Sequence, residues 1–238
     1  SIVAYTWKEG GATIATGSNP SVSLGIGIHA IVLTVEDNDG AIDSDTVVIT
    51  VEEGQSGSDP VTVSSRVSTG NDDAEQYQSG GSMYLNSSDL ELVYDGSKGN
   101  QYIGIRFNNM VIPQGATITD AYIQFTVDET NSGTTNLIIK GQDADNPGGF
   151  TTSNYNISNR TSTSASVNWS PAPWTSVGAA GADQRTPNLA SVVQEIVNRS
   201  GWSPGNSMVM IIAGTGERTA ESYNGSSSKA PLLVVTYE

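Results

Sequence analysis

The chain has 238 residues, with 25 Asp and Glu against 10 Lys and Arg, so its formal net charge is −15. This balance argues against a nucleic-acid partner, because such binding needs basic side chains that neutralise phosphates. The lack of cysteine excludes disulfides and thiolate metal sites. No apolar run reaches about 18 residues, so we expect no membrane insertion.

Residues 1–53 have the pattern of antiparallel strands. Residues 29–35 (HAIVLTV) and 45–51 (DTVVITV) alternate between apolar and polar side chains, and the polar stretch between them contains an Asp-Gly pair suited to a hairpin turn. Residues 4–7 (AYTW) predict a further short strand. Gly, Ser and Pro then make residues 54–60 (GQSGSDP) a predicted linker.

Residues 61–238 predict a second and larger set of strands. Residues 122–127 (YIQFTV) alternate well, and residues 208–212 (MVMII) are continuously apolar, as in a buried central strand. A helix is predicted over residues 187–199, with Thr186 as N-cap, Pro187 as the first helical residue and Gly201 at its end. One apolar face at spacings of three and four supports this helix.

The N-terminal segment resembles the C-terminal part of a PKD (polycystic kidney disease) domain, which is immunoglobulin-like. The match covers Tyr5-x-Trp7, Gly27-x-His29, residues 32–41 (VLTVEDNDGA) and residues 45–48 (DTVV). The resemblance implies a partial β-sandwich over residues 1–53 whose N-terminal strands are absent. Such a sandwich exposes unpaired sheet edges, which a strand from another segment or chain can complete.

The segment 61–238 resembles the DNRLRE-type β-sandwich of the disaggregatase-related and carbohydrate-binding-module group. The matching stretches are residues 103–107 (IGIRF), 111–118 (VIPQGATI), 121–125 (AYIQF), 193–197 (VQEIV) and 230–237 (APLLVVTY). This resemblance implies a jelly-roll-like β-sandwich, an extracellular location and polysaccharide binding. The expected fold class is therefore all-β, with a partial immunoglobulin-like sandwich followed by a larger jelly-roll-like sandwich that carries one short helix.

Acidic residues in the second segment predict a structural calcium site. Calcium takes six to eight oxygen ligands, many of them carboxylates. The alternative is a set of ordinary turn acids and solvated carboxylates, and for Asp37, Asp39, Asp43 and Asp45 of the first segment turn chemistry is the preferred interpretation. The candidate calcium ligands are Asp72, Asp73, Glu75, Asp89 and Glu91.

Aromatic and basic residues in turn-rich stretches predict a carbohydrate site. Sugar rings have apolar faces that stack on aromatic rings, and their hydroxyl or acidic groups take hydrogen bonds from arginine. The alternative for the tryptophans, stronger for Trp202, is that they plug the sandwich ends as core residues. The candidate sugar-binding residues are Trp169, Trp174, Arg160, Arg185, Arg218 and Tyr223.

Catalytic signatures are missing from the sequence. There is no cysteine nucleophile, no Gly-x-Ser-x-Gly motif and only one histidine, His29. The favoured hypothesis is a non-catalytic polysaccharide-binding module with an immunoglobulin-like spacer, from a secreted or cell-surface protein. The alternatives are a structural subunit of an extracellular filament, sheath or adhesin, with neighbouring copies of the same chain as partners, and a polysaccharide lyase or hydrolase.

Overall fold

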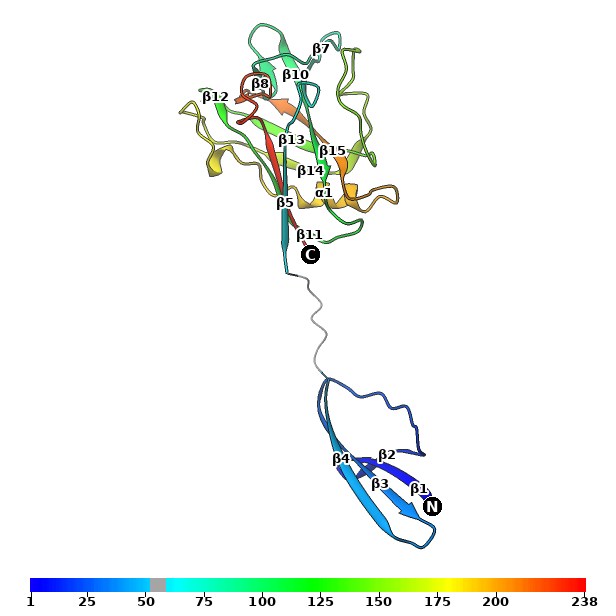
Figure 1. The fold of residues 1–238 in the computed structure, drawn as a ribbon. Coiled ribbons are helices and arrows are strands. Elements are labelled where there is room, and N and C mark those ends of the chain that lie inside the picture. Colours follow the sequence, from blue (N-terminus) through cyan, green and yellow to red (C-terminus); the bar gives the residue numbers. More distant parts are fainter. Residues whose placement is uncertain (52–58) are drawn as a thin grey trace. The chain divides into compact units, whose positions relative to one another are not determined.

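The computed structural model describes residues 1–51 and 59–238 and divides the chain into two compact units, Ser1–Ser58 and Asp59–Glu238 (Figure 1). Both units consist of antiparallel strands, which confirms the predicted all-β class. Most of the predicted linker falls outside the described residues. Among the described residues, no helix is both long enough and apolar enough to cross a membrane.

The N-terminal unit is a single four-stranded sheet in the order β2-β1-β3-β4. Its strands are β1 (Ile2–Glu9), β2 (Ala12–Thr16), β3 (Gly27–Asp37) and β4 (Ile42–Val51). Asp37 closes the β3–β4 hairpin, since its Oδ1 accepts hydrogen bonds from the backbone N–H groups of Asp39 (2.9 Å) and Ala41 (2.8 Å). Gly40 supplies the left-handed conformation that the turn requires, with φ 82°. These contacts fit the turn-chemistry interpretation of Asp37.

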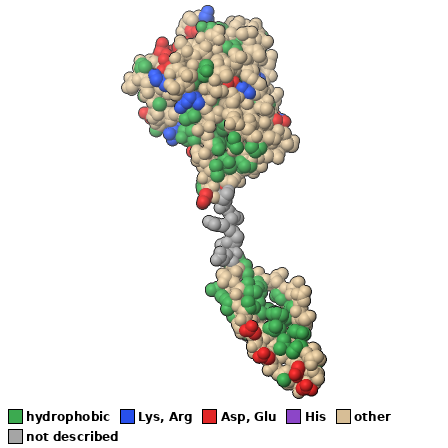
Figure 2. All heavy atoms as spheres, in the orientation of Figure 1, with side chains coloured by type: hydrophobic (Ala, Val, Ile, Leu, Met, Phe, Trp, Pro, Cys, Tyr) green, Lys and Arg blue, Asp and Glu red, His purple; other side chains and the backbone are tan. Residues whose placement is uncertain are grey.

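The N-terminal sheet leaves most of its apolar side chains in contact with solvent. Ile31 is the one buried hydrophobic residue within residues 1–51. Val47 is 47% exposed and Ile28 75% exposed. Figure 2 shows hydrophobic side chains gathered over this unit.

The larger sheet of the C-terminal unit has the strand order β14-β13-β15-β10-β6-β7. A further short strand, β9, also pairs with β10. The two central strands, β10 and β15, run antiparallel, with Ile103 opposite Ile212 and Ile105 opposite Met210. The strands of this sheet are β6 (Asp73–Tyr77), β7 (Met83–Tyr84), β9 (Tyr94–Asp95), β10 (Gly99–Met110), β13 (Asn136–Gln142), β14 (Ser162–Trp169) and β15 (Asn206–Thr215).

The remaining strands of this unit form two three-stranded sheets, in the orders β11-β17-β5 and β12-β16-β8. Inward side chains such as Ile103 of β10 join Ile123 of β11 and Leu233 of β17 in one fully buried core. The strands are β5 (Val61–Arg66), β8 (Asp89–Glu91), β11 (Ile118–Gln124), β12 (Val127–Glu129), β16 (Thr219–Glu221) and β17 (Leu232–Tyr237).

The one α-helix of the described residues, α1 (Ala190–Val197), is shorter than predicted, and a 3₁₀ helix, η1 (Ala182–Gln184), precedes it. The predicted N-cap was wrong. Thr186 Oγ1 accepts a hydrogen bond from Ile123 N–H, whereas Asn188 Oδ1 accepts from Ala190 N–H (2.8 Å) at the helix start. Gly201 also does not end the helix, which stops at Val197. Position 201 instead leaves no room for a side chain, because a Cβ on Gly201 would clash with the carboxylate of Asp145.

The loop of residues 143–161 covers part of the outer face of the larger sheet. Phe150 and Ile157 of this loop pack over Gly104 on β10, where a Cβ would lie 2.4 Å from the Phe150 ring. A side chain at position 104 would therefore push the loop away from the sheet. The remainder of the outer face stays open beside the loop.

Candidate functional site

A groove of about 330 Å³ lies on the outer face of the larger sheet, and we call it the outer-sheet groove. Strands β10, β13 and β15 form its floor, and the end of the 143–161 loop with the start of β14 forms its wall. Its volume lies in the range of small-molecule sites, about 300–1,000 Å³. The lining residues are Tyr102, Ile138, Lys140, Ile157, Ser158, Arg160, Ser162, Ile211 and Ala213.

Strand alternation explains why these residues face outward. Successive side chains of a strand point to opposite faces, so Ile139 and Ile212 enter the core while Ile138 and Ala213 lie on the outer face. The register places Ile138 opposite Ala213, and Lys140 opposite Ile211. The floor is therefore apolar along the middle strands, with the Lys140 ammonium beside it.

Arg160 builds the wall of the groove. Its Nε donates to the backbone oxygen of Asn156 at 2.8 Å, and Nη1 donates to Gln142 Oε1 (2.8 Å) and the backbone oxygen of Gly148 (2.9 Å). Nη2 donates to the Gly149 oxygen (3.0 Å) and to Asn156 Oδ1 (3.2 Å). All five N–H donors are thus engaged within the protein. The predicted role of Arg160 as a hydrogen-bonding ligand for sugar is not supported by this geometry, which instead makes it a positioning residue.

Lys140 has a different role from Arg160. Its Nζ makes no hydrogen bond or ion pair with the described part of the chain, and no Asp or Glu is among the groove-lining residues. The groove is therefore locally cationic although the whole chain carries a net charge of −15.

The two tryptophans predicted to stack on sugars lie in the core. Trp169 is 5% exposed and Trp174 is 0% exposed. The Trp169 ring stacks on Phe125, with centroids 5.7 Å apart, and Trp174 Nε1 donates to the backbone oxygen of Asp183. Neither ring can receive a ligand in this arrangement, so the core interpretation applies to both, as it does to Trp202, which is 2% exposed.

The other predicted sugar-binding residues make contacts within the protein, although Arg185 remains exposed. Arg218 is 1% exposed, and its guanidinium donates to backbone oxygens that include those of Ala172 and Gly133. The Arg185 guanidinium lies 4.0 Å from the centroid of the Tyr122 ring. Tyr223 packs against the core. Of the six candidates, only Arg160 lines the outer-sheet groove, and sequence reasoning missed Tyr102 and Lys140.

The five predicted calcium ligands do not converge on one point. Asp72 forms an ion pair with Arg106 at 2.7 Å, and Asp73 accepts a hydrogen bond from Tyr223 N–H at 2.7 Å. Burial raises the pKa of Asp73 to about 6. Glu75 lies two residues further along β6, where its Oε1 accepts from Glu91 N–H at 3.0 Å. The described residues therefore do not bring the five predicted ligands into one shell, because Asp72 pairs with Arg106 whereas Glu75 contacts Glu91.

Glu75 forms a buried acid pair with Glu91. Glu75 is 2% exposed, and Gln101 Nε2 donates to its Oε1 at 3.2 Å. Burial, with the neighbouring Glu91 carboxyl, raises the pKa of Glu75 to about 10. Glu75 is therefore protonated at neutral pH, in keeping with a carboxyl group that has been removed from water beside a second one.

A second group of acids does converge. One carboxylate oxygen from each of Asp89, Asp128 and Glu129 lies within 4.8 Å of the others. Glu221 lies opposite Asp89 in the β16–β8 register and is ion-paired with Lys229 at 2.9 Å. We call the side chains of Asp89, Glu91, Asp128, Glu129 and Glu221 the acidic face.

Comparisons with known proteins yield a weak likeness to solved structures. No protein-family model matches the chain, and no curated protein matches it significantly. Among solved structures, it is similar to one from a study of the "structural basis for the promiscuous specificity of the carbohydrate-binding modules from the beta-sandwich super family". The identity is 11% and the TM-score 0.23, over 99% of this chain and 83% of that chain. We therefore infer fold and function from the residues of this chain and not from this likeness.

The Glu75 environment predicts a pH dependence of stability. Between the ordinary pKa of 4.5 and the raised value of about 10, folded Glu75 keeps a proton that the unfolded chain has lost. Stability contributed by this group therefore falls as pH rises through that window. We expect Glu75→Gln, which keeps the hydrogen-bonding shape but does not ionise, to gain about 1 kcal/mol or more over the parent between pH 5 and pH 8.

Urea unfolding at both pH values, in a buffer with chelator, measures this difference. Asp120→Asn is the control, because Asp120 lies on β11, outside the pair of Glu75 and Glu91, and its offset from the parent should be the same at both pH values. A Glu75→Gln offset that is also independent of pH would contradict the protonated state of Glu75.

Proposed function

We propose that the chain is a non-catalytic polysaccharide-binding module that holds its ligand in the outer-sheet groove. The observation that carries this proposal is the combination of an apolar floor with the Tyr102 ring and the Lys140 ammonium on the open face of the sheet. The PKD-like and DNRLRE-like resemblances support a spacer before the binding unit and an extracellular location, secreted or at the cell surface.

The groove has the chemistry that a sugar chain needs. Pyranose rings present apolar C–H faces, and Ile138, Ala213 and the Tyr102 ring offer apolar surface for them. The hydroxyl group of Ser162 lies on the wall for hydrogen bonds to sugar hydroxyls, and Ser158 Oγ, which accepts from Gln76 Nε2 at 2.8 Å, can still donate its own proton. The Lys140 ammonium favours polysaccharides that carry carboxylate groups at this position. This local attraction opposes the long-range repulsion between such a polysaccharide and the acidic protein.

Binding rather than turnover is favoured by what lines the groove. Glycoside hydrolases use two carboxyl groups on either side of the scissile bond. The groove-lining residues include no carboxyl group, and the buried acid pair of Glu75 and Glu91 belongs to a different part of the unit. The proposed ligand therefore does not meet an acid pair in the groove.

Two groove variants test this proposal. We expect Tyr102→Ala and Lys140→Ala each to weaken polysaccharide binding by about fivefold or more, the equivalent of about 1 kcal/mol, because each removes a central contact. The measurement is affinity electrophoresis on a panel of neutral and uronate-containing polysaccharides. Tyr84→Ala is the matched control, since this tyrosine is 45% exposed on β7 and does not line the groove.

Two results would overturn the proposal. One is that no polysaccharide in the panel retards the parent chain. The other is that both groove variants retain parental affinity for a polysaccharide that the chain does bind. If Lys140→Ala loses affinity for uronate-containing polysaccharides but keeps it for neutral ones, the result would support a contact between Lys140 and a carboxylate of the ligand.

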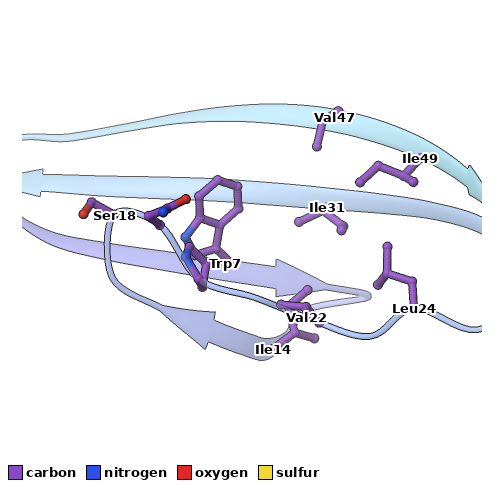
Figure 3. A pocket seen from close by; sticks show the side chains of 10 residues that line it. Trp7, Ile14, Ser18, Val22, Leu24, Ile31, Val47 and Ile49 are labelled. Carbon is purple, nitrogen blue, oxygen red and sulfur yellow. The ribbon is translucent and has the colours of Figure 1, made fainter.

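The N-terminal sheet favours a second candidate function, the structural subunit. A hollow of about 290 Å³ lies over one face of the sheet, and Figure 3 shows Trp7, Ile31 and Val47 turned toward it from neighbouring strands. Strand β4 is a ten-residue edge of this sheet within the described residues. A long exposed edge strand can pair with an identical strand in antiparallel orientation, and the apolar side chains of the hollow beside it give a second copy of the chain a surface to cover.

Sedimentation velocity over a wide concentration range tests self-association. The candidate predicts a dimer or larger species at high concentration, and Val47→Asp, which places a charge in the hollow, should shift the equilibrium toward monomer. A parent chain that stays monomeric up to millimolar concentration would remove this candidate and leave the groove proposal unaffected.

A further inference from the structure

The acidic face lies on the small sheet formed by β12, β16 and β8. In the β16–β8 pair, Thr219 lies opposite Glu91 and Glu221 opposite Asp89. On the other side of β16, Thr219 lies opposite Glu129, and the register shifts between Val127 and Glu129. The irregularity places the extra residue, Asp128, in the strand next to Glu129, as β-bulges do when they re-aim side chains.

The spacing of the three clustered carboxylates suits one cation. Calcium–oxygen distances are about 2.3–2.6 Å, so two oxygens on the same ion lie within about 5 Å of each other. The oxygens of Asp89, Asp128 and Glu129 lie within 4.8 Å. Their carboxylates come from segments that are about 40 residues apart, so proximity in sequence does not account for the cluster.

A second and independent observation lies beneath these carboxylates. Thr219 is 0% exposed, and its Oγ1 has no hydrogen-bond partner among the described residues. Buried hydroxyl groups in folded proteins are nearly always satisfied, so an unpaired one points to a missing partner. The register sets Thr219 between Glu91 and Glu129, so that its side chain shares a face of the sheet with both carboxylates.

The charges of the acidic face are poorly balanced within the protein. Lys229 pairs with Glu221 at 2.9 Å, and no other ion pair to the acidic face occurs in the described ranges 1–51 and 59–238. Five carboxylates that share one ammonium repel each other at short range. A divalent cation would remove most of this repulsion.

We propose that the acidic face binds a calcium ion through Asp89, Asp128 and Glu129, with the Thr219 hydroxyl as a supporting partner beneath it. Hard carboxylate and hydroxyl oxygens favour calcium over metals that prefer nitrogen or sulfur. Because the ligands come from β8 and β12 on either side of β16, the ion would hold three strands together. This site shares only Asp89 with the ligand set predicted from sequence, and it is separate from the outer-sheet groove.

The test compares the calcium-free with the calcium-loaded form of the 238-residue chain. The protein is treated with chelator and dialysed, then titrated with calcium chloride by calorimetry and melted with and without calcium. The proposal predicts binding heat and a higher Tm with calcium. Asp128→Asn should lose the Tm shift, yet its calcium-free Tm should equal or exceed that of the parent, because one repelling charge is gone.

Further variants keep the test decisive. Glu129→Gln changes an exposed side chain and serves if Asp128→Asn does not fold; its calcium shift should also be lost. Thr219→Val should lower calcium affinity by about tenfold, as loss of a supporting partner does, without lowering the calcium-free Tm. Asp120→Asn, on β11 and outside the cluster, should keep the full shift.

Three outcomes would overturn the site. These are the absence of both heat and Tm shift in the parent, a full calcium shift retained in Asp128→Asn and Glu129→Gln, or loss of the shift in Asp120→Asn. The polysaccharide assay is run on the same calcium-free samples, so failure of the calcium site and failure of the groove are recorded separately.

Discussion

Burial of apolar side chains between the two layers of the C-terminal unit determines which side chains of the larger sheet face outward. Strands β10, β13 and β15 point Ile103, Ile139 and Ile212 inward, where each is fully buried. Alternation then compels their neighbours to face outward, and a slip of one residue in register would exchange the two sets. The outer-sheet groove is therefore a consequence of the core: the half-buried side chains of Tyr102 and Ile138 face outward because those of Ile103 and Ile139 face inward.

Charge is distributed unevenly over this unit. The acidic face gathers five carboxylates on the β12-β16-β8 sheet, whereas the outer-sheet groove is lined by Lys140 and Arg160 and by no carboxylate. Such separation allows one unit to attract a cation at one place and a sugar chain with negative groups at another. The net charge of −15 therefore does not indicate the local charge of either site.

Sequence patterns predicted the strands well, because alternation reports directly on a half-buried sheet, and they located the helix through its apolar face. They failed where the environment comes from distant segments. Trp169 and Trp174 have polar and proline neighbours, which suggested exposed loops, but Trp169 ends β14 on its inward side and stacks on Phe125. The Asp128–Glu129 pair meets Asp89 only through the register of β16 and a bulge, neither of which leaves a local sequence signal.

Binding in the outer-sheet groove is tested most directly by amide chemical-shift mapping of the labelled chain during titration with an oligosaccharide from a polysaccharide that retards it. We expect shifts concentrated on β10, β13, β15 and the wall of the outer-sheet groove, at Tyr102, Lys140, Ser158 and Ser162. Shifts confined to the loop segments around Trp174 and Arg218, with the groove unchanged, would contradict it.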